Sequence, residues 1–132
     1  MKTRKVLDAY ALLAYLKGES GHLRVKELLA LGAKDLLINA INVGEVFYIV
    51  ARARGFREAE YFLSVILPSL PITVLDNSFE DVIEAARLKA GHALSLADCF
   101  AAATAIRERA ALVTGDREFE KLARAVDIDW LG

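Results

Sequence analysis

Short runs of apolar residues alternate along the chain with longer segments in which apolar and polar residues recur at helical spacing. The short runs are rich in Val, Ile and Leu and are typical of strands that are buried on both faces of a parallel sheet. They predict strands at residues 3–7, 35–38, 72–75 and 111–113, and a weaker candidate for a fifth strand at 128–130.

The segments between these runs favour helices. A glycine follows each of the first three helical segments, where glycine often ends a helix, and we expect Pro68 to end the fourth. Ser78, Ser95 and Asp116 each precede a helical segment and are suitable N-caps. The predicted helices span residues 9–17, 21–31, 42–54, 57–67, 79–89, 96–109 and 117–125.

Strands that alternate with helices and are joined by short loops predict a parallel sheet with right-handed crossovers. The expected fold class is α/β, a three-layer α/β/α, Rossmann-like fold with a central, mainly parallel sheet of four to five strands. The 132 residues contain no internal repeat, low-complexity segment or linker, so we expect one domain spanning residues 1–132.

The amino-acid composition limits the classes of protein to which the chain can belong. The chain is 55% hydrophobic and 27% charged, which is typical of a folded protein. Its single cysteine, Cys99, excludes an intramolecular disulfide, and no apolar run suits a secretory signal or a membrane span. We therefore expect a cytoplasmic protein without membrane contact. The net charge of −1 argues against binding nucleic acid by bulk electrostatics alone.

Four acidic residues lie where a parallel sheet usually carries its functional site, beyond the carboxyl ends of the strands. Asp8 directly follows the first predicted strand, and Asp116 comes shortly after the fourth. Glu45 and Asp98 lie near the first turns of helices that enter or cross the same edge. We expect all four carboxylates to point toward one place.

Three of the four also have a structural explanation. Asp8 and Asp116 stand where helices begin, and Asp is a preferred N-cap. Ser95 and Asp98 have the spacing of a capping box, in which the carboxylate binds the N-cap amide. Taken singly, each of these aspartates is explained by capping.

Glu45 is harder to explain because it interrupts a helical segment that is apolar nearly all round. Arg52 and Arg54 lie about two turns further on, beyond the usual i, i+4 pairing distance. Unless Glu45 shares a solvent-facing stripe with Asn42, its charge needs a positive partner.

A divalent cation accounts for all four acidic residues at once. Mg²⁺ and Mn²⁺ take oxygen ligands, and a metal makes closely spaced carboxylates tolerable. Such a site suits phosphodiester hydrolysis, because a metal activates water and stabilises the leaving oxygen. His22, His92 and Cys99 are scattered along the chain, which disfavours zinc.

Four segments together resemble one known family. They are residues 6–13 (VLDAYALL), 42–46 (NVGEV), 95–98 (SLAD) and 112–119 (LVTGDREF). In this order and at these separations they resemble the PIN-domain family, and within it the VapC-type toxins of prokaryotic toxin–antitoxin pairs. The resemblance covers nearly the whole chain.

The resemblance implies a PIN-like form of the predicted fold and an endoribonuclease that depends on Mg²⁺, with Mn²⁺ as an alternative. It implies that Asp8, Glu45, Asp98 and Asp116 are both the catalytic residues and the metal ligands. It also implies an RNA substrate, a homodimer, and a cognate antitoxin that blocks the site. Thr114 matches the family's hydroxyl residue beside the last Asp, where it would orient that carboxylate or a metal-bound water.

Two positions depart from the family's pattern. Many relatives have a small hydroxyl residue where this chain has Tyr10, and an Asp where it has Glu118. Neither departure removes a member of the acidic quartet. Glu118, Asn42 and Ser95 are expected to support the quartet together with Thr114.

Basic residues near the helix ends and loops are candidates for contacts with RNA phosphates. They are Arg52, Arg54, Lys89 and Arg117. Each also fits a simpler role, since a cation near a helix C-terminus is favourable in any solvated turn.

Two other interpretations stay open at this point. A signalling receiver domain has a similar length and alternation, and Asp8, Asp76 and Thr114 would mimic its phospho-acceptor pocket. That interpretation lacks the receiver's second acidic residue and its late lysine, and it gives Glu45 and Asp98 no role. The other alternative is a catalytically inactive PIN-like module that keeps the fold for protein contact.

Overall fold

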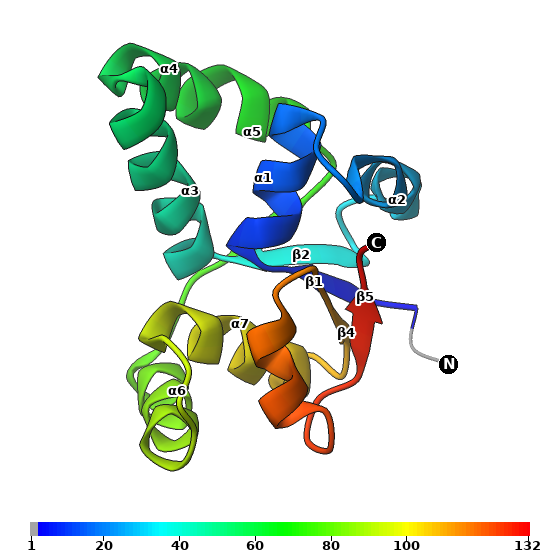
Figure 1. Cartoon of the computed structure of the whole chain (residues 1–132), viewed down its shortest axis with the longest axis vertical. Helices are drawn as coiled ribbons and strands as arrows, with labels where there is room; N and C mark the ends of the chain where they lie inside the picture. The colour runs from blue at the N-terminus through cyan, green and yellow to red at the C-terminus, as the bar shows by residue number, and fades with distance from the viewer. Residues whose placement is uncertain (1–2) are drawn as a thin grey trace.

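A five-stranded parallel sheet forms the centre of the computed structural model, which describes residues 3–132 (Figure 1). The strand order is β3-β2-β1-β4-β5. The strands are β1 (Lys5–Leu7), β2 (Leu36–Asn39), β3 (Thr73–Leu75), β4 (Ala111–Thr114) and β5 (Ile128–Trp130), and every neighbouring pair is parallel. The predicted α/β fold is confirmed, and the weaker fifth strand is present. The first two residues of the basic amino-terminal segment lie outside the described residues.

Helices cover both faces of this sheet (Figure 1). One face carries α1 (Ala9–Lys17), α2 (His22–Leu28), the 3₁₀ turn η1 (Leu29–Leu31), α3 (Ala40–Arg54), α4 (Phe56–Tyr61), the π-helical turn η2 (Phe62–Ile66) and α5 (Leu67–Ser69). The other face carries α6 (Phe79–Gly91), α7 (Leu96–Arg107) and the 3₁₀ helix η3 (Arg117–Leu122). Within residues 3–132, no helix combines the length and the apolar character needed to cross a membrane.

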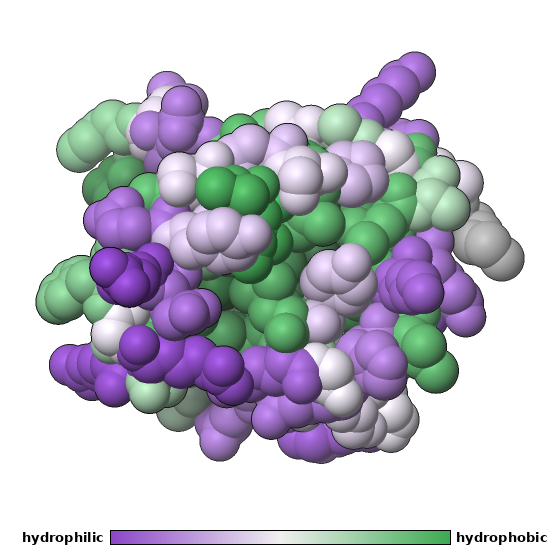
Figure 2. Space-filling view, turned by 90° about the horizontal axis from the view of Figure 1, so that it is seen from above, coloured by the Kyte–Doolittle hydropathy of each residue, from purple (hydrophilic) through white to green (hydrophobic). Residues whose placement is uncertain are grey.

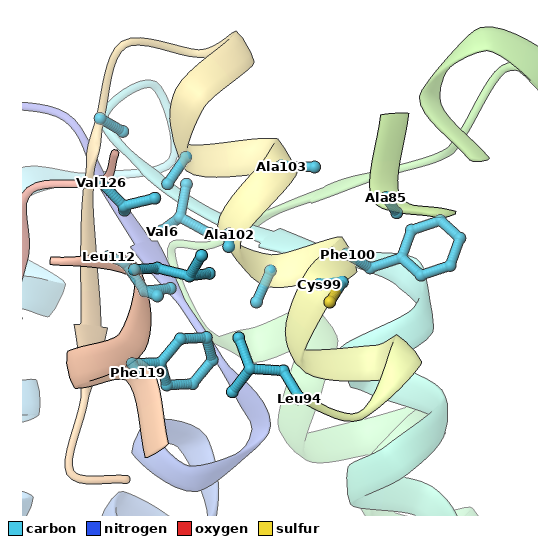
Figure 3. Close-up of a cluster of buried hydrophobic side chains, with 14 of the residues drawn as sticks. Val6, Ala85, Leu94, Cys99, Phe100, Ala102, Ala103, Leu112, Phe119 and Val126 are labelled. Atoms are coloured by element: carbon cyan, nitrogen blue, oxygen red, sulfur yellow. The ribbon is translucent and has the colours of Figure 1, made fainter. Parts of the chain in front are cut away.

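Each face of the sheet has its own buried core, because successive strand residues point to opposite sides. Leu7 packs with the helices α1–α5, whereas its neighbour Val6 packs with α7 and η3. Figure 3 shows the second core, in which Leu112 of β4 and Phe119 of η3 meet the alanine-rich α7. The small side chains of residues 101–103 let α7 lie close to the strands.

Several predicted helix ends are confirmed. Asp8 caps α1, and Gly18 closes it in the left-handed conformation at φ 63°. Ser78 caps α6 and forms a full capping box with Asp81. The start of α3 differs from the prediction, because Asn39 accepts the Ile41 N–H at 2.8 Å and so begins the helix two residues earlier than expected.

Two predicted helices have a different form. Pro68 does not end its helix, and the π-helical turn η2 just before it shifts the hydrogen-bond spacing where the proline lacks an N–H. The segment after Asp116 is a short 3₁₀ helix and not an α-helix to residue 125. Side chains at i and i+3 align in a 3₁₀ helix, so Phe119 and Leu122 both enter the second core.

The strand order excludes the receiver interpretation. Receiver-type sheets have the order 2-1-3-4-5, whereas this sheet has the Rossmann-like order 3-2-1-4-5. The chain therefore changes direction across the sheet between β1 and β4. Ligands of open parallel sheets bind at such a switch point, beyond the carboxyl ends of the strands.

A buried asparagine ties the end of β2 to the elements around it. The Asn39 Nδ2 donates to Oγ1 of Thr104 on α7 at 2.8 Å and to Oδ1 of Asn77 after β3 at 2.7 Å. The Asn77 Nδ2 returns a bond to Asn39 Oδ1 at 3.0 Å. One side chain thus caps α3 and anchors α7, the helices that carry Glu45 and Asp98.

We predict that Asn39→Ala lowers the free energy of unfolding by about 2–4 kcal/mol, because it removes an N-cap and leaves buried polar partners unpaired. Urea denaturation monitored by circular dichroism measures the change. The half-buried partner gives a control, since Asn77→Ala should cost about 1 kcal/mol. Equal and small losses in both variants would show that the network does not stabilise the fold.

Candidate active site

The buried carboxylate of Asp8 lies at the switch point between β1 and β4. Its side chain is 2% exposed. Its Oδ1 accepts the Ala11 N–H at 2.8 Å, and its Oδ2 accepts the hydroxyl of Thr114, the last residue of β4. The same Thr114 Oγ1 accepts the Asp116 N–H at 3.0 Å. Thr114 thereby connects the first and last members of the acidic quartet.

Burial raises the pKa of Asp8 to about 7. The hydrogen bonds from Thr114 and Ala11 favour the ionised form and oppose this shift, whereas the negative charges of Asp98 and Glu45 add to it. The carboxylate is therefore held in position by donors, but its charge is disfavoured by its surroundings.

Asn42 links the two helices that bring the other carboxylates to the site. Its Nδ2 donates to Glu45 Oε1 at 2.9 Å and to the Ala97 carbonyl at 3.1 Å, one residue before Asp98. Asn42 is 0% exposed, so the solvent-facing stripe considered for Glu45 does not exist. Its buried Oδ1 has no hydrogen-bond partner within residues 3–132.

The remaining pKa shifts show that the acidic groups act on one another. Burial and the charge of Asp116 raise the pKa of Glu45. Burial raises the pKa of Asp98 to about 6, with contributions from the charges of Asp116, Glu45 and Glu118, although a hydrogen bond from Ser95 opposes the shift. Together with the charges acting on Asp8, these interactions join all four predicted carboxylates in one electrostatic cluster.

The capping explanation holds for some of these residues only. The Asp116 Oδ1 accepts the Glu118 N–H at 3.0 Å, so Asp116 caps η3 as Asp8 caps α1. At α7 the Ser95 hydroxyl accepts the Asp98 N–H at 3.1 Å. The reciprocal bond from the Asp98 carboxylate, which would complete a capping box, is not among the contacts of the described chain. The predicted capping box is therefore incomplete, although the Ser95 side chain interacts with the Asp98 carboxylate.

No protein cation balances this cluster in the part of the chain that is described. The ion pairs among these residues lie elsewhere, and none includes Asp8, Glu45, Asp98 or Asp116. The described side chains also offer no ready-made group of three His, Cys, Asp or Glu metal ligands. Mg²⁺ suits such an open arrangement because it keeps several waters and needs only one or two carboxylates. The donor chemistry fits Mg²⁺ or Mn²⁺ and does not fit a closed zinc site.

Two of the predicted basic residues lie near the cluster. Arg117 follows Asp116 directly, and its guanidinium lies 4.4 Å from the centroid of the Trp130 ring. Burial and the charge of Asp98 raise the pKa of Cys99, and the charge of Lys89 on α6 opposes this shift, so Lys89 is also within electrostatic reach.

The other two basic residues are placed differently. Arg52 and Arg54 lie in the last turn of α3, a helix of 15 residues that is about 20 Å long. The first turns of α3 carry the cluster's Glu45, so these arginines lie toward the opposite end of the helix (Figure 1). Arg52 is held over the ring of Tyr48, 5.5 Å from its centroid.

Two features of the site were absent from the sequence-based prediction. Asn39 and its partner Thr104 fix α3 and α7 from behind the carboxylates. An asparagine between an apolar run and a helix is a recognisable N-cap signal, but nothing local marks Thr104 as its partner. The Tyr10 ring lies against Gly115, where a Cβ atom would overlap it.

The sequence matches the PIN domain family over residues 5–125. The chain therefore belongs to the PIN-domain family, whose members are nucleases. No curated protein matches the chain by direct sequence comparison.

Solved structures with the same fold come from toxin–antitoxin systems. DNA-bound VapBC from Salmonella typhimurium is similar, with a TM-score of 0.74, 21% identity, and coverage of 96% of this chain and 96% of the other. VapBC2 from Rickettsia felis, bound to a promoter DNA fragment, has a TM-score of 0.72, 21% identity, and coverage of 97% and 98%. The sarcin–ricin loop cleaving toxin VapC20 of Mycobacterium tuberculosis has a TM-score of 0.69, 17% identity, and coverage of 92% and 95%.

We predict that the metal-free protein becomes less stable as the pH rises from 5 to 8. The pKa of Asp8 is about 7 in the folded protein and near 4 in an unfolded chain, so the folded form binds its proton more tightly in this range. The loss amounts to at most about 4 kcal/mol, since one pKa unit is worth about 1.4 kcal/mol. Urea denaturation in EDTA at several pH values measures it.

The variant Asp8→Asn should lose the part of this pH dependence that comes from Asp8, because its side chain does not ionise, and keep the part that comes from the raised pKa of Asp98. Unfolding free energies of the unaltered protein that are equal at pH 5 and 8, or higher at pH 8, would contradict the proposed environment of Asp8.

Proposed function

We propose that the chain, acting as one domain, is an endoribonuclease that depends on Mg²⁺, with Mn²⁺ as an alternative. In this proposal Asp8, Glu45, Asp98 and Asp116 are both the metal ligands and the catalytic residues. One observation carries it: the pKa values of Asp8, Glu45 and Asp98 are raised by burial and by negative charges from the other members of the quartet, and none of the ion pairs of the described residues includes a member. Membership of a nuclease family supports the same reaction.

The chain's own residues would position this chemistry. Asp8 is fixed by the Ala11 N–H and the Thr114 hydroxyl, so its oxygens keep one orientation. Asn42 fixes Glu45 relative to the backbone beside Asp98. A divalent cation held by these carboxylates supplies the positive charge that lowers the pKa of water and stabilises the leaving oxygen of a phosphodiester.

Other residues have supporting roles in this proposal. Ser95 positions Asp98 through the first turn of α7. Glu118 adds negative charge near Asp98, and it also pairs with Lys121, whose Nζ donates to the Ala93 carbonyl at 2.9 Å. These contacts tie η3 to the loop that precedes α7.

RNA is the proposed substrate, and cationic side chains near the cluster are proposed to contact its phosphates. Arg117 is the best placed of them for such a contact, since it directly follows Asp116 and its guanidinium is stacked on the Trp130 ring. Lys89 could contact phosphates on the α6 side. Contacts from Arg52 and Arg54 would require the RNA to extend along α3. The similar protein VapC20 is a toxin that cleaves the sarcin–ricin loop, which supports the proposed activity.

We further propose that the chain is the toxin of a toxin–antitoxin pair, forms a homodimer, and binds a cognate antitoxin that blocks the site. Similar structures of VapBC pairs support an antitoxin partner. Figure 2 shows apolar side chains around a hollow on the side where α4, α5 and α1 lie in Figure 1. Helices on that side expose Tyr61, Leu63 and Val65, and exposed apolar patches often mark protein interfaces.

We predict RNA cleavage by the purified chain with Mg²⁺ or Mn²⁺, and none with EDTA. Each of Asp8→Asn, Glu45→Gln, Asp98→Asn and Asp116→Asn should lower kcat/KM at least about 100-fold, because each removes a charge that holds the metal. Cleavage of labelled RNA resolved on denaturing gels measures the rates.

Asp76→Asn is a matched control, since Asp76 follows β3 at the same edge of the sheet but does not act on the cluster. It should cleave RNA as the unaltered protein does. If all five variants are as active as the unaltered chain, the four carboxylates are not the catalytic residues. If the unaltered chain does not cleave RNA, the inactive-module alternative holds instead.

We also predict that expression of the unaltered chain in a bacterial host stops growth, because the nuclease destroys an essential RNA. Asp98→Asn, at the same level of folded protein, should leave growth normal. Colony counts after induction, with immunoblots of the protein, compare the two. Normal growth with the active nuclease present would contradict the toxin assignment and leave the nuclease proposal standing.

A further inference from the structure

An aromatic ring stands beside the acidic cluster and has no part in the chemistry proposed above. Tyr10 lies in the first turn of α1, two residues after Asp8. The residue is 45% exposed, although its ring lies against Gly115. Gly115 separates Thr114, which binds Asp8, from Asp116. The ring therefore bridges the two loops that carry the first and last members of the quartet.

The contact explains why residue 115 is a glycine. A Cβ atom there would overlap the Tyr10 ring, so any other side chain would displace the ring or the loop. The ring is thus held on one side by backbone that is itself fixed through Thr114, while Tyr10 as a whole is an exposed residue. An aromatic side chain restrained in this way can bind a flat partner with little further loss of conformational freedom.

Negative charge around the acidic cluster opposes the binding of RNA, so a contact that does not depend on charge would add to the affinity. A phosphate chain that approaches Asp8, Asp98 and Asp116 meets further negative charge from Glu118, and the net charge of the whole chain is −1. The net charge of the protein therefore supplies little attraction for RNA beyond the proposed metal and the few nearby cations. Stacking of a base on an aromatic ring does not depend on charge, and it contributes about 1–3 kcal/mol per base.

We propose that the Tyr10 ring stacks on an unpaired RNA base next to the scissile phosphate. This inference rests on the proposed ribonuclease function, and it deepens it by naming a residue that contacts the substrate. Bases in a duplex are stacked on one another and cannot reach such a ring, whereas bases in loops and single strands can.

The test compares two substitutions at position 10. Tyr10→Phe keeps the aromatic ring, and Tyr10→Leu keeps an apolar side chain against Gly115 without a ring. Each is combined with Asp98→Asn to prevent cleavage, and the dissociation constant for a short RNA that the active protein cuts at one bond is measured by fluorescence anisotropy. We expect Tyr10→Leu to weaken binding about 10-fold and Tyr10→Phe to change it less than about 2-fold.

The partner base is identified with RNAs that lack one base at a time. At the stacked position, removal of the base should weaken binding to the Tyr10 protein. It should leave binding to the Tyr10→Leu protein unchanged, because that protein has already lost the stacking interaction with this base. At other positions the two proteins should lose affinity equally. Equal losses at every position, or equal binding by both proteins to the intact RNA, would overturn the proposal.

Kinetics in the cleavage-competent protein separate stacking from a purely structural role of the ring. Stacking predicts that Tyr10→Leu raises KM, leaves kcat nearly unchanged, and cleaves a fully paired duplex as poorly as the unaltered protein. A lower kcat with unchanged KM would assign Tyr10 to support of the Asp116 loop and overturn the proposal. Absence of RNA cleavage by the unaltered chain would overturn the proposed function and this inference together, whereas normal cleavage by Tyr10→Leu would overturn the stacking alone.

Discussion

Two hydrogen bonds hold the Asp8 carboxylate in a buried position where β1 and β4 meet, while the charges of Glu45 and Asp98 act against it. The buried position of Asp8 follows from the strand order, because β1 and β4 are neighbours at the point where the chain changes direction across the sheet. A carboxylate in such a place is stable as an acid at low pH or as an anion beside a cation. The described protein supplies no such cation, and this is why a divalent metal is central to the proposed function.

The rest of the fold keeps these like charges together. Asn39 anchors α7 while it caps α3, and Asn42 joins the same two helices closer to the carboxylates. Both asparagines are buried, and neither carries a charge that would neutralise the site. Neutral amides can hold acidic groups in place without pairing with them. The carboxylates consequently remain available to bind a cation, and their mutual repulsion lowers the stability of the metal-free protein.

The fold was predictable from the sequence because its signals are local, and the same signals single out the four carboxylates as the candidate site. Apolar runs marked the strands, and a strand followed by Asp8 placed that residue at the functional edge. The negative charges of the acidic residues act on one another, although the sequence offered capping as an equal explanation for three of them. The partners of Asn39 and the contact of Tyr10 with Gly115 join residues that are far apart in the chain, so no periodicity or spacing revealed them. The prediction that Pro68 ends its helix was wrong for a related reason. Local rules place the end of a helix at a proline, but a π-helical turn just before Pro68 accommodates it.

Binding of Mn²⁺ to the purified chain tests most directly whether the cluster is a metal site. Electron paramagnetic resonance reports the free ion during a titration and needs no substrate or catalysis. The account predicts saturable uptake by the unaltered protein, weakened at least about 10-fold in Asp8→Asn and in Asp98→Asn but unchanged in Asp76→Asn. Uptake that is absent, or that is the same in all four proteins, would contradict it.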